Sequence, residues 1–518
     1  MVEPKKILWA DDEINQLRPH IIFMEEHGYS VGGVASGEDA VELVKRGGYD
    51  LVLLDEMMPG MDGLTTLEEI RKIDKRIPIV MITKSEEESL MEDAIGKDIA
   101  DYLVKPVNPH QILSCLKRIF DTSRIVGQQL TRDYTAEYRE MSLTSPQSPE
   151  QWLKLAYWLS EWDVIIDSHP DLGLEEMHRE FRRECNTEFG RFVLENYQRW
   201  IHADRTSRPL LSTDLAAEKL IPHLRAGKKL FFIVIDCMRL DQWLSVESAM
   251  AQHFDIQTEV FFSILPSATP FCRNALFSGL FPLELSERYP ELWIRPEEGS
   301  ASCNRYEHQL LDKLIAQEGI ELPGDTKYIK ILDPEEGESL VQRLKSYLSA
   351  PMTSVDVNFL DILAHSRAAN EVLKEISPNE SAYRSVMKTW LAHSSLYKAL
   401  MNLASEDITI VITTDHGSIF GRRGTKAYGR RDTSTNLRYK FGDNINCDTK
   451  GGVLIKNPKD WRLPSFTKTT NFIVALEDYY FIYPTNFAQY EKQYCNSFLH
   501  GGISLEEMVV PVATLTPR

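Results

Sequence analysis

Short apolar runs in the last three-fifths of the chain each deliver an acid or an imidazole at the end of the run. The run FFIVID ends at Asp236, SVDVNFLD ends at Asp361, and ITIVITTDH ends with Asp415 and His416. From about residue 226 onward such runs alternate with helix-like segments, which predicts an α/β domain with its functional groups at the carboxyl ends of the strands. The side chains expected to meet at one site are Asp236, Thr269, Asp361, His365, Asp415, His416 and His500.

The chemistry of this set predicts a two-metal centre. Carboxylates and imidazoles without a thiolate suit Zn²⁺ or Mn²⁺ ions that take part in hydrolysis. Two divalent cations close together can activate a hydroxyl and stabilise a phosphoryl transition state. Each residue alone has a plainer interpretation, because Asp236 could cap the next helix and Thr269 could lie in an ordinary Ser/Thr-Pro turn. The prediction therefore depends on the ordered combination.

Residues 1 to about 120 carry a second pattern of strand ends with functional groups. Five predicted strands, KKILWAD, YSVGGVAS, YDLVLLDE, PIVMITKS and DYLVKPV, alternate with amphipathic stretches and predict a doubly wound parallel sheet. Asp11 and Asp12 end the first strand, Asp55 the third, Thr83 the fourth and Lys105 the fifth. These ends converge on one edge of a parallel sheet, where three carboxylates would bind Mg²⁺. Asp55 would then accept a phosphoryl group that Lys105 and Thr83 contact.

The N-terminal pattern closely resembles the receiver domain of two-component response regulators. The match consists of Asp11 and Asp12, Asp55 with Pro59 and Gly63 after it, Thr83, and Lys105 with Pro106. The resemblance implies a (βα)5 fold in which Asp12, Asp55 and the Met57 carbonyl hold the Mg²⁺. It also implies that Tyr102 is the aromatic side chain whose rotation reports phosphorylation. An acid pair after a strand is common on solvated loops, so the combination carries the prediction.

Residues from about 121 to 225 lack strand patterns and show apolar residues at helical spacing. Trp152, Trp158, Trp162 and Trp200 are expected to pack within or between helices rather than to line a ligand site. Acidic residues outnumber basic ones in this stretch, which argues against a bundle that reads DNA. We therefore expect a receiver at 1–122, a helical linker or dimerisation bundle at 123–225, and the α/β domain at 226–518.

The bulk composition excludes several classes of protein. The chain has 77 acidic and 58 basic residues, a formal net charge of −19, which argues against a protein that coats nucleic acid. The seven cysteines are dispersed without a C-x-x-C pair, as expected of reduced thiols rather than a disulfide framework. The first residues lack the apolar segment of a signal peptide, and no run is long enough to span a bilayer. We expect a cytoplasmic protein without membrane association.

The ordered series Asp, Thr, Asp-x-x-x-His, Asp-His and His resembles the alkaline phosphatase superfamily. This resemblance implies that one Zn²⁺ is held by Asp361, His365 and His500, and that the second is held by Asp236, Asp415, His416 and the Oγ of Thr269. It makes Thr269 a nucleophile that forms a covalent phosphothreonine, in preference to the rival Ser267, because Thr269 fits the family spacing. A sulfatase is not expected, because Cys272 lies out of register with the C/S-x-P-x-R signature.

A basic stretch after the predicted ligands favours an anionic substrate. Between residues 421 and 440 the single acid Asp432 accompanies Arg422, Arg423, Lys426, Arg430, Arg431, Arg438 and Lys440. The stretch could focus a substrate with several phosphates, such as a nucleotide or oligonucleotide phosphodiester, or it could be a disordered basic loop. The candidate substrate-binding residues are Arg273, Asn274, Arg422, Arg423, Arg438 and Lys440.

The order of receiver, helical middle and alkaline-phosphatase-like domain resembles response regulators with a PglZ-type output domain. That resemblance implies a partner sensor histidine kinase, phosphorylation-promoted homodimerisation, an extracytoplasmic-function sigma factor as a target, and regulation of type IX secretion. It also implies Zn²⁺-dependent phosphodiesterase activity on linear or cyclic oligonucleotides. The alternative is a regulator without enzymatic activity that acts by protein–protein binding and uses the metal site as a structural clamp. Sequence-specific DNA binding is the weakest hypothesis, because no basic recognition helix is present.

Overall fold

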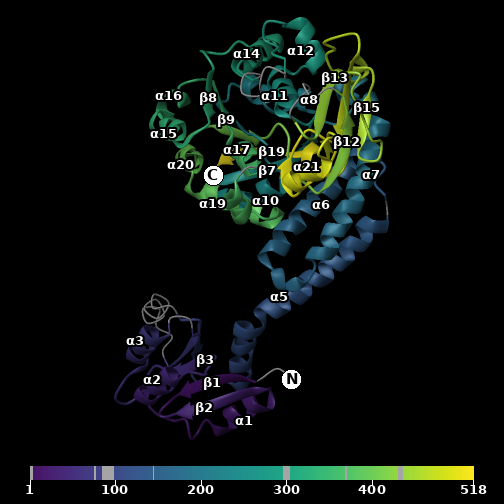
Figure 1. Cartoon of the computed structure of the whole chain (residues 1–518). Helices are drawn as coiled ribbons and strands as arrows, with labels where there is room; N and C mark the ends of the chain where they lie inside the picture. The colour runs from purple at the N-terminus through teal and green to yellow at the C-terminus, as the bar shows by residue number, and fades with distance from the viewer. Residues whose placement is uncertain are drawn as a thin grey trace. The chain divides into compact units, whose positions relative to one another are not determined.

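The computed structural model describes residues 4–74, 77–84, 99–143, 145–295, 304–367, 370–429 and 436–518. Contacts within the chain divide it into two compact units, Met1–Ala136 and Glu137–Arg518. The boundary falls inside helix α5 (Pro109–Leu143), which is labelled in Figure 1. The domain boundaries expected near residues 122 and 225 stay predictions.

The N-terminal unit contains a five-stranded parallel sheet with the strand order β2-β1-β3-β4-β5. The strands are β1 (Lys5–Ala10), β2 (Tyr29–Val34), β3 (Leu51–Asp55), β4 (Ile79–Thr83) and β5 (Asp101–Val104). The helices are α1 (Arg18–Glu26), α2 (Gly37–Arg46), α3 (Gly63–Ile73) and the first part of α5. The predicted receiver fold is confirmed. The helix expected between β4 and β5 falls mostly on residues 85–98, outside the described part of the chain.

The alternation of apolar residues along these strands supplies a core to both faces of the sheet. Ile7 and Trp9 of β1 face one core, to which α1 and α5 contribute Ile21 and Ile112. Leu8 of β1 faces the other core, which the buried residues of α2 and α3 complete. A strand covered on both faces is apolar throughout. Its polar groups can therefore gather at its end, and Asp55 is the last residue of β3.

The helical middle of the chain begins the larger unit. It consists of α6 (Pro149–Ser168) and α7 (Glu175–His202), with short 3₁₀ turns η1 (Pro170–Leu172) and η2 (Arg205–Ser207) after them. Ser148 caps α6 with its side chain, and Gln151 completes a capping box. Trp152, Trp158 and Trp162 are buried, as the apolar spacing predicted. The helical prediction for this region is confirmed.

The centre of the larger unit is a mixed sheet with the strand order β7-β19-β10-β6-β9-β8. The strands are β6 (Leu230–Ile235), β7 (Phe254–Phe262), β8 (Lys327–Ile331), β9 (Met352–Val357), β10 (Thr409–Thr413) and β19 (Val509–Pro517). Strands β8, β9, β6 and β10 are parallel, whereas β19 runs antiparallel to both of its neighbours. The carboxyl ends of β6, β9 and β10 therefore share one edge.

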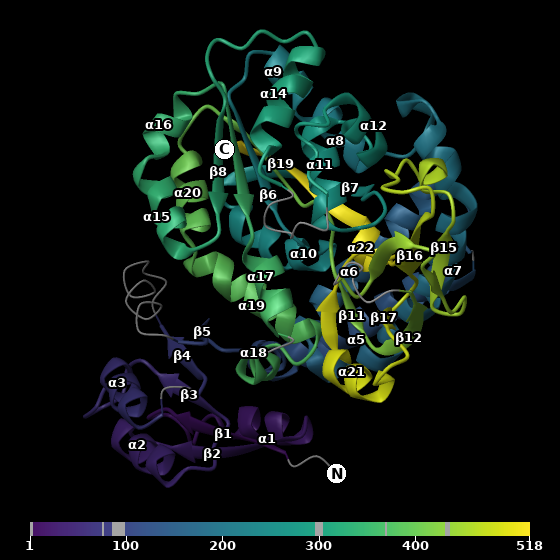
Figure 2. The ribbon, with the colours of Figure 1, turned by 45° about the horizontal axis from the view of Figure 1, so that its top comes forward.

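Helices cover both faces of this sheet (Figures 1 and 2). One face carries α10 (Leu240–Met250), α15 (Pro334–Gln342), α16 (Leu344–Leu348), α17 (Phe359–Arg367), α19 (Glu380–His393) and α20 (Ser395–Leu403), with α18 (Glu371–Ile376) beside α17. The other face carries α8 (Ser212–Lys219), α9 (Ile221–Arg225), α11 (Thr269–Ser278), α12 (Pro282–Arg288) and α14 (Glu307–Gln317). Alternate residues of β6, such as Phe231 and Phe232, face the two cores. No helix among the described residues is long and apolar enough to cross a membrane.

The chain between β10 and β19 adds three small sheets to the larger unit. They contain β11 (Ile419–Gly421), β12 (Arg423–Tyr428), β13 (Tyr439–Asp443), β14 (Asn446–Cys447), β15 (Gly452–Ile455), β16 (Thr470–Ala475), β17 (Tyr479–Ile482) and β18 (Ser497–Leu499). The remaining elements are η4 (Pro458–Trp461), α21 (Phe487–Tyr494) and α22 (Leu505–Met508). Most of the described part of the basic stretch is thus paired strand rather than a free loop.

Candidate active site

The predicted ligands lie just beyond the strand ends, as the pattern of apolar runs predicted. Asp236 follows β6, and Asp415 and His416 follow β10. Asp361 and His365 lie on α17, which begins two residues after β9, and His500 follows β18. Thr269 is the first residue of α11. The structure therefore brings segments that are far apart in the sequence to one edge of the central sheet.

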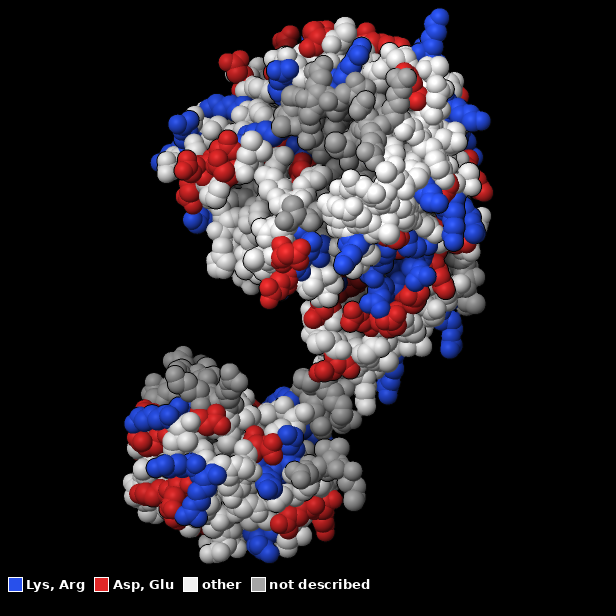
Figure 3. Space-filling view, in the orientation of Figure 1, with Lys and Arg blue, Asp and Glu red and all other residues white. Residues whose placement is uncertain are grey.

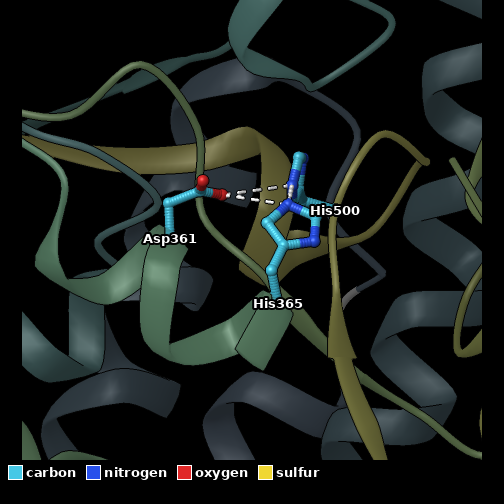
Figure 4. Close-up of side chains that lie close together, drawn as sticks. All are labelled: Asp361, His365 and His500. Carbon is cyan, nitrogen blue, oxygen red and sulfur yellow. Dashed lines mark hydrogen bonds and ion pairs between the residues drawn. The ribbon is translucent and has the colours of Figure 1, made fainter. Parts of the chain in front are cut away.

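Asp361, His365 and His500 form the first of two ligand groups (Figure 4). Oδ1 of Asp361 lies 3.3 Å from Nε2 of His365 and 3.4 Å from Nε2 of His500. The two Nε2 atoms are 3.1 Å apart. Burial acts to raise the pKa of Asp361, but the two neighbouring imidazoles outweigh it and bring the pKa well below its usual value. The carboxylate is therefore ionised, as a ligand must be.

Asp236, Asp415 and His416 form the second group, and all three are buried. Nε2 of His416 lies 3.8 Å from Oδ1 of Asp236 and 3.7 Å from Oδ2 of Asp415. Nδ1 of His416 lies 3.0 Å from the Gly417 carbonyl, which accepts its hydrogen and leaves the lone pair on Nε2. Burial lowers the pKa of His416 to about 4, so the ring is neutral near pH 7 and can bind a cation.

Thr269 lies against the second group. Its Oγ1 is 3.0 Å from Nε2 of His416 and 3.4 Å from Oδ1 of Asp236. The rings of His416 and His500 are stacked, with centroids 4.4 Å apart and planes inclined by 15°. The two groups are therefore neighbours, and the hydroxyl of Thr269 shares their site. All seven side chains that the sequence predicted to meet lie together.

Arg273 supports the second group from inside the protein. Its side chain is fully buried, and its guanidinium pairs with Asp236, with Asp415 at 3.2 Å and with Asp356 at 2.7 Å. These bonds fix the carboxylates that face His416. Because Arg273 has no exposed surface, its prediction as a substrate-binding residue is not supported. Sequence reasoning missed Asp356, although an acid at an inward position of the run SVDVNFLD was a signal.

The other predicted substrate-binding residues are mostly engaged within the fold. Arg438 is buried and its Nε donates to Glu507 at 3.0 Å, while Arg423 pairs with Asp478 and Glu477. Asn274 is buried and donates to the Pro270 carbonyl at 2.9 Å. Lys440 is buried beside the Asn436 carbonyl, and burial lowers its pKa to about 8.

Arg422 keeps 39% of its side-chain surface exposed, and its ion pair with Glu380 is 3.8 Å long. Arg430 and Arg431 lie outside the described residues. Figure 3 shows Lys and Arg side chains gathered on one part of the drawn face of the larger unit, with Asp and Glu side chains along their border. The idea that the basic stretch as a whole focuses an anion is therefore not supported by the residues the structure describes, because most of their charges are matched locally.

The N-terminal unit has its own acidic cluster, made by Asp11, Asp12 and Asp55. Nζ of Lys105 lies 2.8 Å from Asp55 and 3.0 Å from Asp11. Burial and the nearby Asp11 raise the pKa of Asp55, although Lys105 opposes this shift. A divalent cation would relieve the repulsion between these carboxylates.

The predicted switch residues Thr83 and Tyr102 lie on the neighbouring strands β4 and β5. The hydroxyl of Thr83 donates to the carboxylate of Glu56. Tyr102 keeps 38% of its surface exposed and Met57 keeps 66%. Sequence reasoning did not single out Glu56, which follows the predicted phosphorylation site directly. In this structure Thr83 contacts Glu56, so its predicted hydrogen bond to a phosphoryl group stays an expectation.

Family models match the chain in three consecutive stretches. The response regulator receiver domain matches residues 7–117, and the PorX response regulator linker domain matches residues 124–201. The BREX system PglZ alkaline phosphatase-like domain matches residues 215–515, more than half of the chain. The chain belongs to the PglZ family. With a receiver and a PorX linker ahead of the PglZ domain, it has the domain order of a PorX-like response regulator.

Individual relatives of this PglZ-family chain match it over a smaller part. The transcriptional regulatory protein ResD of Bacillus subtilis (strain 168) is 31% identical in an alignment of 201 residues that covers 35% of this chain and 81% of ResD. The transcriptional regulatory protein ZraR of Salmonella typhimurium is 30% identical over 32% of this chain and 37% of ZraR. The structure of the chemotaxis protein CheY4 of Vibrio cholerae is 27% identical and covers 23% of this chain and 99% of CheY4, with a TM-score of 0.22.

Proposed function

We propose that the chain is a response regulator whose PglZ domain is a two-zinc phosphodiesterase with Thr269 as its nucleophile. The observation that carries the proposal is the place of the Thr269 hydroxyl, 3.0 Å from His416 and 3.4 Å from Asp236. A hydroxyl in contact with two predicted metal ligands is well placed to attack phosphorus. The proposed substrates are linear or cyclic oligonucleotides.

The residues present fit two divalent cations. In the first group the Nε2 atoms of His365 and His500 face each other at 3.1 Å, where one hydrogen at most fits between them. A shared cation would satisfy both lone pairs together with Asp361. In the second group the hydrogen bond of His416 to Gly417 presents Nε2 as a ligand. Zn²⁺ bound there would lower the pKa of the Thr269 hydroxyl and offset the charge of the phosphoryl group.

The proposed reaction consists of two displacements at phosphorus. In the first, the Thr269 hydroxyl loses its proton, with Oδ1 of Asp236 as the nearest carboxylate acceptor at 3.4 Å. Oγ1 then bonds to phosphorus while the bond to one alcohol of the diester breaks, and that alcohol leaves with a proton. In the second, water attacks the phosphothreonine diester, and the bond from phosphorus to Oγ1 breaks. Thr269 regains its proton, and a phosphate monoester is released.

Hydrolysis of bis(p-nitrophenyl) phosphate by the full-length protein tests this proposal. We expect turnover with Zn²⁺, loss of turnover after chelation with EDTA, recovery on adding Zn²⁺ back, and slower hydrolysis of p-nitrophenyl phosphate. His500→Ala should lower kcat by at least about 100-fold, because losing a ligand costs more than the 10–100-fold typical of residues that support ligands.

His393→Ala is the matched control for this experiment, because His393 is an exposed histidine at the end of α19 and should leave kcat unchanged. A metal-loaded wild-type protein that hydrolyses neither ester would reject the phosphodiesterase. That result would favour the regulator that acts by protein–protein binding with a structural metal site.

The same proposal places the phosphodiesterase under control of the receiver. A sensor histidine kinase would supply the phosphoryl group, Asp55 would accept it, and receiver dimerisation would change the output. An extracytoplasmic-function sigma factor and type IX secretion are the proposed downstream targets. The proposal is supported by the receiver match and by the contacts of Lys105 with Asp55 and Asp11 in the N-terminal unit.

A further inference from the structure

Residues 500–508 form a segment that contacts several parts of the candidate active site. The segment begins with His500, a member of the first ligand group. The carbonyl of Gly502 accepts a hydrogen bond of 2.6 Å from Ser267, two residues before Thr269. The carbonyl of Glu507 accepts a hydrogen bond of 3.1 Å from the backbone of Gly417, the residue after His416. A shift of this segment would therefore displace both ligand groups and the loop before Thr269.

The segment packs tightly against Gly417. A Cβ atom at Gly417 would lie 2.0 Å from the carbonyl oxygen of Glu506, so the backbones of the two loops are in direct contact. The carboxylate of Glu507 adds bonds within the segment, because it accepts from the backbone of Gly502 at 2.8 Å and from Ser504 at 2.6 Å. The segment is therefore held together by its own hydrogen bonds, and Arg438 also pairs with Glu507.

Helix α7 of the helical middle anchors this segment. Oδ1 of Asn186 accepts the backbone N–H of Leu505 at 2.8 Å. Nδ2 of Asn186 donates to the carboxylate of Glu506 at 2.9 and 3.2 Å. Arg182, one turn earlier on α7, donates to the same carboxylate at 3.3 Å. All these side chains are buried, so water does not compete for the bonds.

A second, partly buried connection joins the helical middle to the segment after Asp236. Arg384 of α19 binds Asp167 of α6 at 2.6 and 2.9 Å, and it binds Asp241 of α10 at 2.8 Å. Asp241 in turn accepts two hydrogen bonds from Arg239, at 2.9 and 2.8 Å. The middle helices therefore hold the two loops that carry Asp236 and His500.

We infer that Asn186 is a positioning residue of the metal centre, and that α7 is a structural part of the PglZ active site rather than a connection to the receiver. The match to the PglZ family model begins at residue 215, so this anchor lies outside it. Asn186 suits the task because its amide offers one acceptor to Leu505 and one donor group to Glu506. The expected change in kcat rests on the proposed function. The expected change in Zn²⁺ affinity does not depend on whether the protein hydrolyses a diester.

A swap of polarity at positions 186 and 506 tests the inference in the full-length protein. Asn186→Asp keeps the bond to Leu505 but places a carboxylate against that of Glu506. We expect a loss of about tenfold or more in Zn²⁺ affinity, measured by competition with a chromophoric chelator, and a similar loss in kcat for bis(p-nitrophenyl) phosphate at unchanged KM. The double variant Asn186→Asp with Glu506→Gln restores a donor opposite an acceptor, so both values should return to within about threefold of the wild type.

Asn196→Asp is the matched control for the swap. Asn196 lies on the same helix, and its amide donates to the carbonyl of Phe192 in α7 itself. This variant should keep wild-type Zn²⁺ affinity and kcat. The inference is overturned if Asn186→Asp keeps both values while its melting temperature falls, or if the double variant is no better than Asn186→Asp. A wild type that binds Zn²⁺ without hydrolysing the diester would reject the phosphodiesterase, and Zn²⁺ affinity would still decide the role of Asn186.

Discussion

Replacing Thr269 with alanine should lower kcat for bis(p-nitrophenyl) phosphate by about 10³-fold or more in protein that still binds two Zn²⁺. The methyl group of alanine has no oxygen to attack phosphorus, so the covalent route is lost. The variant can still use direct attack by water at the metal centre. This route is far slower than the route through a covalent intermediate. Zn²⁺ content should stay near the wild-type value, because three ligands remain in each group.

The rival nucleophile and a matched threonine define the controls for this variant. Thr389 is exposed on α19 and its hydroxyl bonds within that helix, so Thr389→Ala should leave kcat unchanged. Thr269→Ser should keep a substantial part of the activity, because serine supplies the same oxygen. Ser267 is buried and donates to Gly502, which leaves it poorly placed to attack a substrate. Full activity in Thr269→Ala would reject Thr269 as the nucleophile. The rejection would be clearest if Ser267→Ala were inactive.

Replacing Asp55 with asparagine should abolish the dimerisation that a phosphoryl donor promotes. A carboxamide cannot accept the phosphoryl group, and it also weakens the ion pair that Lys105 makes at 2.8 Å. Wild-type protein with Mg²⁺ and beryllofluoride should move from monomer to dimer in light scattering coupled to gel filtration. Asp55→Asn should give the same mass with and without beryllofluoride.

Asp39 provides the matched control for the receiver variant. It is an exposed aspartate in the first turn of α2, where it bonds with Ser36. Asp39→Asn should dimerise like the wild type when beryllofluoride is added. Dimerisation of Asp55→Asn to the wild-type extent would remove the receiver from the control of association.

The ligand groups could be predicted from the sequence because most of the ligands lie at, or shortly after, the end of an apolar run. A strand buried on both faces is mostly apolar, so an acid at the end of FFIVID or ITIVITT stands out, whereas Asp356 inside β9 was missed. The parallel order of β6, β9 and β10 then brings Asp236, Asp361 and Asp415 to one edge. The N-terminal cluster of Asp11, Asp12 and Asp55 follows from the same physical rule.

The partners of buried charges could not be predicted, because they come from distant parts of the chain. Arg438 looked like a substrate-binding residue in a basic stretch, but it is buried against Glu507. Asn186 carried no signal at all, since its partner Glu506 lies 320 residues further along the chain. Local patterns report burial and strand ends, whereas pairs of this kind depend on how α7 packs against the sheet.

A crystal structure of the Zn²⁺-loaded protein, with anomalous scattering recorded at the zinc edge, tests the proposed two-metal centre directly. Two anomalous peaks are expected in the PglZ domain. One should lie between Asp361, His365 and His500, and the other between Asp236, Asp415 and His416, next to the Thr269 hydroxyl. A single peak, peaks away from these side chains, or no peak in protein soaked with Zn²⁺ would contradict the two-metal centre.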